Sequence, residues 1–309
     1  MQHYLPFTLK LSALVWIISA FVFLAIPHTV AEATCGTIVP TTATVYYPME
    51  ALNEGNSGTG GGGATTHTGT STVTSIATSG TNAINIDTGD SVSFPNTTTV
   101  NQAFSQRTYE LWFVVSSVTG TQQIFEHGGS WKGGGMYLVD DTLYGGVWGG
   151  NGGEPTAAQL AYATITGIQA NTVYHVFMTY DTGTLTLYVN SFGSGTQSDT
   201  QTTSGITSIG AGNNGNLIGG INGNTYQHTG TVTAVNNFDG IVDEFAIYDG
   251  TAYDTVTINA AFDSCVPTAV TMSGFSTHAA AYPVIFITLS TIALGTLTAL
   301  TLRRKQQAL

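Results

Sequence analysis

Apolar and polar residues alternate with period two in two long stretches of the chain, 173–190 and 238–250. Glycine, asparagine and aspartate, the residues that tight turns favour, bound both stretches. This pattern is typical of half-buried antiparallel strands joined by short turns. We expect further short strands at 45–50, 71–76, 82–87, 91–94, 108–115, 123–127, 135–139, 143–148, 208–209 and 217–218.

Helical patterns are almost missing before residue 282. One short helical turn is expected at 255–262, and turn residues separate the other segments. The pattern therefore predicts an all-β domain built as a two-sheet antiparallel sandwich of the jelly-roll type.

The N-terminal end is an apolar run, 11–26, that follows Lys10 and precedes the small residues Ala31-Glu-Ala33. This arrangement is typical of a secretory signal peptide, which we expect to be cleaved after Ala33. An uncleaved membrane helix is the alternative interpretation.

The C-terminal end contains an uncharged run, 282–302, followed at once by Arg303-Arg-Lys305. At about 1.5 Å per residue such a run is roughly 31 Å long, which matches the hydrocarbon core of a bilayer. A basic cluster after the run predicts that the tail stays in the cytoplasm. The residues leave open whether the span is retained or removed by a sorting enzyme.

These ends predict an exported, single-pass membrane protein whose β-domain lies outside the cytoplasm. The expected segments are a signal peptide 1–33, a β-sandwich domain 34–266, a stalk 267–281, a transmembrane helix 282–302 and a basic tail 303–309.

The charge of the predicted domain is strongly acidic. From Thr34 to Ala281 the only basic residues are Arg107 and Lys132, and seventeen residues are acidic. Nucleic acids and anionic membrane surfaces need basic patches on their partners, so neither is expected to bind this domain.

The two cysteines lie at opposite ends of the domain, Cys35 after the predicted cleavage site and Cys265 after the last strand pattern. An even count in an exported protein favours a disulfide, which would tie the first segment of the domain to the last. Two free buried thiols are the alternative.

Five segments form an ordered set: 46–50, 82–95, Tyr109-Glu-Leu-Trp-Phe113, 175–190 and 238–248. Together they resemble the laminin-G-like jelly roll of the concanavalin A-like lectin/glucanase superfamily. The resemblance implies a non-catalytic recognition or adhesion domain that binds a carbohydrate or a protein outside the cell. A self-associating structural component of the envelope and a glycoside hydrolase of the same superfamily are the alternatives.

The same resemblance implies a structural calcium ion between Glu50 of the first strand and Asp243 of the last. Period two places Asp243 on one face with Ile241, Phe245 and Ile247. A carboxylate on an apolar face needs a cation, an ion-pair partner or hydrogen bonds. The alternative is that Asp243 accepts backbone N–H groups at a sheet edge.

Aromatic residues gather in the glycine-rich segment 126–153. Flat rings on glycine-lined loops stack on sugar rings, which makes Trp131, Trp148 and Tyr144 candidate ligand contacts. Asp140 and Asp141 could accept hydrogen bonds from sugar hydroxyls. The alternative is that these rings fill the core or brace loops.

Catalytic patterns are missing from the sequence. Glycosidases of the resembled superfamily carry a Glu-x-Asp-x-x-Glu triplet, which this chain lacks. Asp140-Asp141 and Asp243-Glu244 are adjacent pairs, whose side chains point to opposite faces of a strand. His175 lies in a strand and is expected to be a packed residue. We therefore expect no enzymatic activity.

Overall fold

The computed structural model describes residues 29–35, 42–70, 72–74, 82–150, 152–191, 195–203, 205–212, 215–233 and 237–271. All of them belong to one compact unit, residues 1–271. The predicted membrane span and basic tail, and the predicted signal peptide up to residue 28, lie outside the described residues. Of the helices in the described ranges, none has the length and apolar character needed to cross a bilayer.

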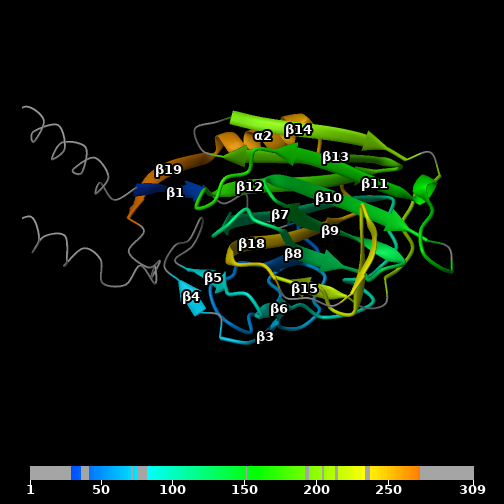
Figure 1. Ribbon diagram of the computed structural model, residues 1–309, viewed down its shortest axis with the longest axis horizontal. Helices are drawn as coiled ribbons and strands as arrows, with labels where there is room; N and C mark the ends of the chain where they lie inside the picture. The colour runs from blue at the N-terminus through cyan, green and yellow to red at the C-terminus, as the bar shows by residue number, and fades with distance from the viewer. Residues whose placement is uncertain are drawn as a thin grey trace, which may run out of the picture. The chain divides into compact units, whose positions relative to one another are not determined.

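Two antiparallel sheets make up the body of the domain (Figure 1). One sheet has the order β11 (Leu160–Thr166), β10 (Thr142–Gly149), β9 (Lys132–Val139), β8 (Thr121–His127), β15 (Asn216–Ile218), β6 (Ser91–Ser93) and β3 (Thr66–Thr68). The other has the order β14 (Gly195–Thr202), β13 (Thr184–Ser191), β12 (Tyr174–Asp181), β7 (Gln106–Val115), β18 (Gly240–Asp249), β5 (Ala83–Ile86) and β4 (Thr72–Thr74), and β2 (Val45–Tyr47) also pairs with β18. We call them the β8 sheet and the β7 sheet.

The remaining described elements are short. A two-stranded ladder pairs β1 (Thr29–Cys35) with β19 (Cys265–Thr271), and a hairpin pairs β16 (Asn224–Gln227) with β17 (Gly230–Thr233). A 3-10 turn, η1, spans Ala157–Gln159, and α2 spans Thr255–Asp263. The Asp254 side chain caps α2 by accepting the N–H of Thr257, 2.8 Å away.

The core lies between the two sheets, and the strands that line it alternate as the pattern predicts. In β7, Tyr109, Leu111 and Phe113 belong to the main buried cluster, together with apolar residues of β8, β9 and β10. The opposite face of the β7 sheet is covered by α2, whose Ile258 and Phe262 pack against Phe177. The predicted all-β, two-sheet antiparallel sandwich is confirmed.

Some strands have no counterpart in the sequence pattern. β14 is exposed along nearly its whole length, so it has no buried face to produce alternation. The buried face of β11 includes the small residues Ala161 and Ala163, so the alternation of apolar and polar residues is weak in this strand. The strand expected at 208–209 is only a single bridge between Ile209 and Phe104.

Strand β18 contains a β-bulge that changes the face of its side chains. The pairing of β18 with β7 shifts between Asp243 and Ala246, and Glu244 adopts a left-handed φ of 53°. Val242 before the bulge and Phe245 after it both enter the core. The prediction that Asp243 shares a face with Phe245 is therefore wrong, because one extra residue inverts the alternation.

Candidate functional site

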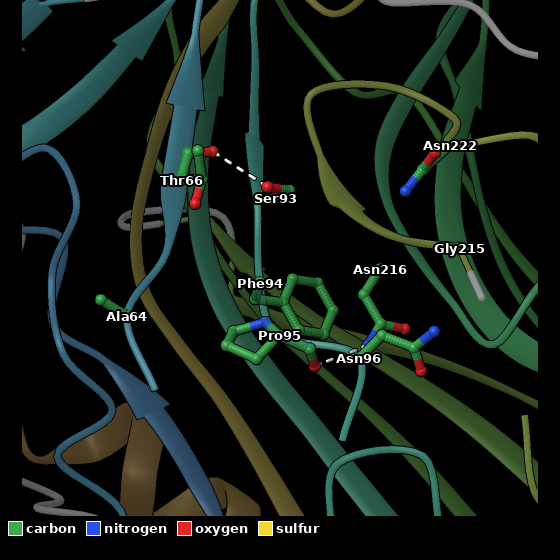
Figure 2. Close-up of a pocket in the computed structure, with 9 residues that line it drawn as sticks. All are labelled: Ala64, Thr66, Ser93, Phe94, Pro95, Asn96, Gly215, Asn216 and Asn222. Carbon is green, nitrogen blue, oxygen red and sulfur yellow. Dashed lines mark hydrogen bonds between the residues drawn. The ribbon is translucent and has the colours of Figure 1, made fainter. Parts of the chain in front are cut away.

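A pocket opens at the edge of the β8 sheet where β3, β6 and β15 lie side by side (Figure 2). It has a volume of about 390 Å³, within the usual range for small-molecule sites. Its lining residues are Ala64, Thr66, Ser93, Phe94, Pro95, Asn96, Gly215, Asn216 and Asn222. We call it the asparagine pocket.

The polar side chains that line this pocket carry amide or hydroxyl groups, and none of its described lining residues is an aspartate or glutamate. The Ser93 hydroxyl donates to the Thr66 carbonyl at 3.1 Å, and Asn216 Nδ2 donates to the Pro95 carbonyl at 3.0 Å (Figure 2). Phe94 and Pro95 add apolar surface. Neutral polar groups beside an apolar wall suit an uncharged ligand that carries both hydroxyl or amide groups and apolar faces.

Asn216 is 2% exposed, and its Oδ1 has no hydrogen-bond partner among the described residues. Its amide orientation is set by donation from Nδ2 to the Pro95 carbonyl and, at 2.8 Å, to Asn101 Oδ1. A buried acceptor without a donor is costly unless something supplies one. This oxygen is itself buried, so it is an unsatisfied acceptor within the pocket wall and is not exposed to the pocket.

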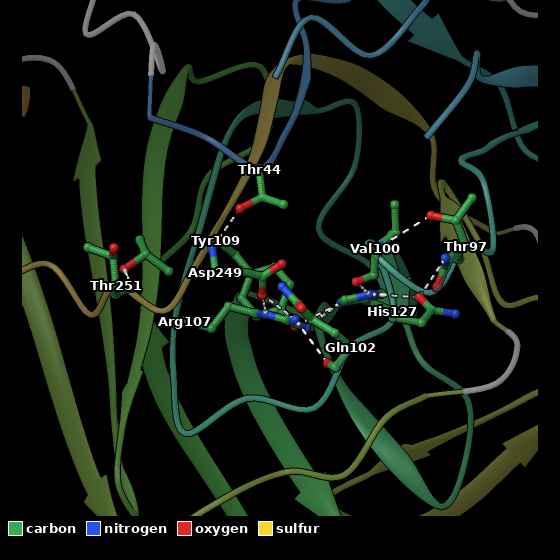
Figure 3. Close-up of polar contacts among 12 residues, drawn as sticks. Thr44, Thr97, Val100, Gln102, Arg107, Tyr109, His127, Asp249 and Thr251 are labelled. Atoms are coloured by element: carbon green, nitrogen blue, oxygen red, sulfur yellow. Dashed lines mark hydrogen bonds and ion pairs between the residues drawn. The ribbon is translucent and has the colours of Figure 1, made fainter. Parts of the chain in front are cut away.

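Asn101 connects the pocket to a buried network that spans the two sheets. Figure 3 shows the part of this network around Arg107, Tyr109 and His127. Asn101 Oδ1 also lies 2.9 Å from His127 Nε2, and Asn101 Nδ2 donates to Asn96 Oδ1. On its other side, His127 Nδ1 lies 3.3 Å from an Arg107 guanidinium nitrogen and 2.9 Å from the Tyr109 hydroxyl. Arg107 in turn forms a buried ion pair with Asp249.

The neighbours of His127 define its tautomer. Burial, and after it the charge of Arg107, holds the pKa of His127 well below 6.5, so the imidazole is neutral. A guanidinium only donates, so Nδ1 accepts and Nε2 carries the proton. Nε2 then donates to the Val100 carbonyl at 2.9 Å and to Asn101 Oδ1.

Glu126 lies behind the pocket wall and is fully buried. Its Oε2 accepts the backbone N–H of Asn222 at 2.8 Å, whereas Oε1 has no hydrogen-bond partner. Burial raises the pKa of this carboxyl from 4.5 to about 8, against the opposing effect of the Asn222 N–H. A side chain at position 215 would collide with Oε1, so only Gly215, at a φ of 78°, fits beside it.

Two of the predicted aromatic contacts, Trp148 and Tyr144, project from the outer face of β10. Trp148 is 1% exposed, with its ring near Gly133 and Gly135, and its indole N–H donates to the Gly129 carbonyl at 2.7 Å. Tyr144 stacks on Tyr137 and on His228, with ring centroids 5.0 and 4.4 Å apart. Both rings are thus packed against the protein itself.

The β16–β17 hairpin is fastened over this aromatic face. The Tyr162 hydroxyl donates to the Tyr226 carbonyl at 3.0 Å, and Gln227 Nε2 donates to Gln123 Oε1 at 2.9 Å. The hairpin therefore covers part of the surface on which a sugar ring would stack.

The other predicted contacts lie at opposite ends of the β9–β10 hairpin. Trp131, before β9, is 51% exposed. Asp140 and Asp141 form the turn after β9, where Asp140 Oδ1 accepts the N–H of Gly120 at 2.9 Å. The fold does not bring the five predicted ligand contacts to one place, because β9 separates the tryptophan from the two aspartates.

Glu50 and Asp243 lie near the point along β18 where its pairing with β5 ends and its pairing with β2 begins. Glu50 Oε2 accepts the N–H of Asn82 at 3.0 Å, and Asp243 Oδ1 accepts the N–H of Glu244 at 3.0 Å. Both are oxygen ligands of the kind that calcium prefers. In the described part of the chain, no three His, Cys, Asp or Glu side chains gather in a metal-binding cluster. Other ligands would therefore have to be carbonyl oxygens or water.

His175 is a packed residue. Its ring stacks on Trp112 at 3.9 Å, and its Nε2 lies 2.7 Å from Glu110 Oε1 beneath α2. Burial lowers the pKa of His175, although the neighbouring Glu110 opposes that change.

The residues of the asparagine pocket escaped the sequence-based prediction. The local signals are the Asn222-Gly223 dipeptide, which marks a turn, and Asn96-Thr-Thr98, a formal glycosylation acceptor, and neither indicates a binding site. Glu126, Asn101 and Asn216 acquire their relationship to the pocket only through strand pairing between distant segments.

Comparison with known proteins agrees with this architecture. Residues 87–254 match the laminin G-type family described as the concanavalin A-like lectin/glucanases superfamily. No curated protein sequence matches the chain.

Several solved structures share the fold. The binding domain of botulinum neurotoxin DC in complex with rat synaptotagmin II has 14% identity and a TM-score of 0.52, over 73% of this chain and 52% of that one. The botulinum neurotoxin serotype G binding domain has 9% identity and a TM-score of 0.51, over 71% and 50%. The chain thus spans about half the length of these neurotoxin structures.

Proposed function

Because the chain belongs to the concanavalin A-like lectin/glucanases superfamily, we propose that its sandwich is a non-catalytic domain that binds a carbohydrate in the asparagine pocket. The observation that carries the proposal is a pocket of about 390 Å³ that amide and hydroxyl side chains line beside Phe94 and Pro95. Sugars combine hydroxyl groups with apolar ring faces, so they match such a lining.

The absence of lining carboxylates supports binding over hydrolysis. Glycosidases place two carboxyl groups on either side of the bond they cleave. Glu126 is fully buried behind the wall of the asparagine pocket, and the nine residues that line the pocket include no acid.

Replacing Asn222 by alanine is expected to weaken glycan binding about 5- to 10-fold, because a rim amide that bonds the ligand is lost. Glycan-array binding of the full-length chain identifies the ligand, and titration then gives the dissociation constants. Asn224→Ala, at an equally exposed asparagine outside the pocket lining, should leave binding unchanged.

No binding to any glycan would refute the proposal. If Asn222→Ala and Asn224→Ala weakened glycan binding equally, the asparagine pocket would not be the binding site. A protein ligand is the other outcome to consider, since one structural neighbour was solved with rat synaptotagmin II. Trp131→Ala in the same assay tests the predicted aromatic contact.

We also propose that the domain is exported and held at the membrane by residues 282–302, with a Cys35–Cys265 disulfide. The β1–β19 register pairs Cys35 with Cys265, and of β1 the proposed cleavage after Ala33 leaves Thr34 and Cys35. Opposed antiparallel residues have Cα atoms about 4.5–5.5 Å apart, within the range that a disulfide needs. Intact-mass analysis of membrane-fraction protein should show removal of residues 1–33 and one disulfide. Product in the cytosol with two free thiols would contradict this proposal.

We further propose that calcium binds at Glu50 and Asp243. Calcium is then expected to raise the melting temperature of the full-length chain, and a chelator to reverse the rise. Glu50→Gln should abolish the response, whereas Glu154→Gln, at an exposed glutamate elsewhere, should retain it. An unchanged melting temperature with calcium would eliminate a tightly held ion.

A further inference from the structure

Strand β14 forms one edge of the β7 sheet, beyond β13 (Figure 1). It pairs with β13 on one side, and in the described part of the chain no strand pairs with its other side. Seven of its eight residues are exposed. The strands at the opposite ends of the two sheets, β3 and β4, have only three residues each. The free side of β14 is therefore a long and accessible sheet edge.

Four residues of β14 direct their backbone groups to this free side. Thr203, directly after β14, donates its N–H to the Gly183 carbonyl at 2.7 Å, so its backbone faces β13. The direction of the N–H and C=O groups alternates along an antiparallel strand. The groups that point away from β13, and that can pair with another strand, belong to Thr196, Ser198, Thr200 and Thr202.

Beta-14 lacks the residues that usually prevent pairing at a sheet edge. It contains no proline, lysine or arginine. Its one charged residue, Asp199, lies opposite the core residue Leu187 and is therefore on the inner side of the sheet. Asp199 Oδ2 accepts the N–H of Thr164 in β11 at 2.8 Å. The carboxylate thus occupies a backbone donor of β11 and leaves the free side of β14 open.

The sequence of β14 reads almost the same in both directions. Thr196-Gln-Ser-Asp-Thr-Gln-Thr202, reversed about Asp199, differs only by the exchange of two hydroxyl residues, Ser198 and Thr200. A two-fold axis at Asp199 would place each residue of one copy opposite its mirror position in the other. Ser198 would then oppose Thr200 and exchange backbone hydrogen bonds with it, because the backbone groups of both point outward. The strand is thus complementary to itself.

We propose that β14 pairs antiparallel with β14 of a second copy of this chain, with the two-fold axis at Asp199, so that two β7 sheets become one continuous sheet. Hydroxyl residues oppose one another on the outer face. On the inner face, Gln197 of each copy opposes Gln201 of the other. This inference goes beyond the proposed binding function and does not depend on what the asparagine pocket binds.

The two Asp199 side chains limit the strength of this pairing. Like charges directly opposite each other destabilise a strand pair. The glutamine amides provide hydrogen-bond donors beside these carboxylates, and within one chain Gln201 Nε2 already lies 3.3 Å from both Asp199 oxygens. We therefore expect a weak, reversible dimer.

Oxidative cross-linking of the full-length chain tests the pairing and its register. The axis places Asp199 opposite itself in a non-hydrogen-bonded pair, with Cα atoms about 4.5 Å apart, a separation that a disulfide spans. Asp199→Cys should therefore give a covalent dimer above the level of the wild type. Thr202→Cys, at an exposed position of the same strand, is the matched control, because the two copies of this residue would lie about 20 Å apart along the strands.

Sedimentation equilibrium of the full-length chain measures the reversible association. Thr200→Pro removes an outward N–H and keeps the pairing with β13, so it should weaken dimerisation about tenfold or more. Asp199→Asn keeps an oxygen for the Thr164 N–H and removes the opposed charges, so it should strengthen dimerisation about fivefold. Glu154→Gln, at an exposed carboxylate elsewhere, should leave the dissociation constant unchanged.

Three results would overturn the proposal. One is a level of cross-linking for Asp199→Cys no higher than for Thr202→Cys. The second is a dimer that Thr200→Pro does not weaken, which would place the contact on another surface. The third is an Asp199→Asn variant that dimerises no more tightly than the wild type. Melting temperatures verify that each variant folds, and if Thr200→Pro does not, the comparison of Asp199→Cys with Thr202→Cys is decisive.

Discussion

Replacing Arg107 by methionine is expected to lower the free energy of unfolding by about 3–5 kcal/mol. Arg107 is 1% exposed and forms an ion pair with Asp249, and its guanidinium stacks over Phe104 at 3.8 Å. It also donates to the Gln102 carbonyl at 3.2 Å. The variant leaves the Asp249 carboxylate buried without its cation, and Asp249 Oδ2 already lacks a hydrogen-bond partner in the described part of the chain. Chemical denaturation at pH 7 measures the loss.

Lys132 provides the matched control for removing a positive charge, since Arg107 and Lys132 are the only basic residues of the domain between residues 34 and 281. Lys132 is half-buried, and Lys132→Met should change the free energy of unfolding by less than about 0.5 kcal/mol. The double variant Arg107→Met with Asp249→Asn should recover part of the loss, because no uncompensated charge remains. A loss for Arg107→Met no larger than that for Lys132→Met would show that the ion pair does not stabilise the fold.

Replacing Glu126 by glutamine should change how the stability of the domain depends on pH. The folded-state pKa of Glu126 is raised from 4.5 to about 8, so the carboxyl is protonated in the fold at neutral pH. A raised folded-state pKa contributes stability that is fully present below about pH 4.5 and is lost as the pH rises through about 8. The full loss is at most about 5 kcal/mol, an order-of-magnitude figure.

Denaturation at pH 6.5, 7.5 and 8.5 tests this, because Glu126→Gln removes the titrating group. The free energy of unfolding of the wild type should fall across this range, relative to that of the variant. His127 and His175 have lowered folded-state pKa values, so they reduce stability only as the pH falls below about 6.5, where unfolded histidine takes up protons. For Glu154→Gln, at an exposed carboxylate, the free energy of unfolding should change with pH in the same way as that of the wild type. If the free energies of unfolding of Glu126→Gln and the wild type changed equally with pH, this result would contradict the raised pKa of Glu126.

Alternation along the chain was sufficient to predict the sandwich and most of its strands. In β7, β12 and β13, one face is buried in the core, so residues such as Leu111, Val176 and Leu187 recur at every second position. The prediction failed for β14, whose two faces are both exposed, and at Asp243, where one bulged residue inverts the alternation. The period of the hydrophobic pattern indicates which face of a strand is buried. It does not reveal a β-bulge, because a bulge depends on how the strand pairs with its neighbour.

The aromatic residues illustrate a different limit. The sequence singled out Trp131, Trp148 and Tyr144 because their types suit sugar stacking. The fold leaves Trp131 half-exposed, buries Trp148 over glycines and places Tyr144 against His228. Exposure depends on what packs against a ring, and for Tyr144 that partner lies in the turn of a hairpin more than eighty residues later.

The sequence by itself determined the fold class, the acidic charge of the domain and the expectation of an exported binding protein, because these follow from composition and from local periodicity. Only the tertiary structure formed the pocket in which we propose that a ligand binds. Asn96, Asn101, Asn216, Asn222 and Glu126 come from segments that are far apart in the chain, and strand pairing gathers them at one sheet edge. The properties of these side chains depend on burial and on the hydrogen bonds that they form with one another. Neither can be read from the residue types alone.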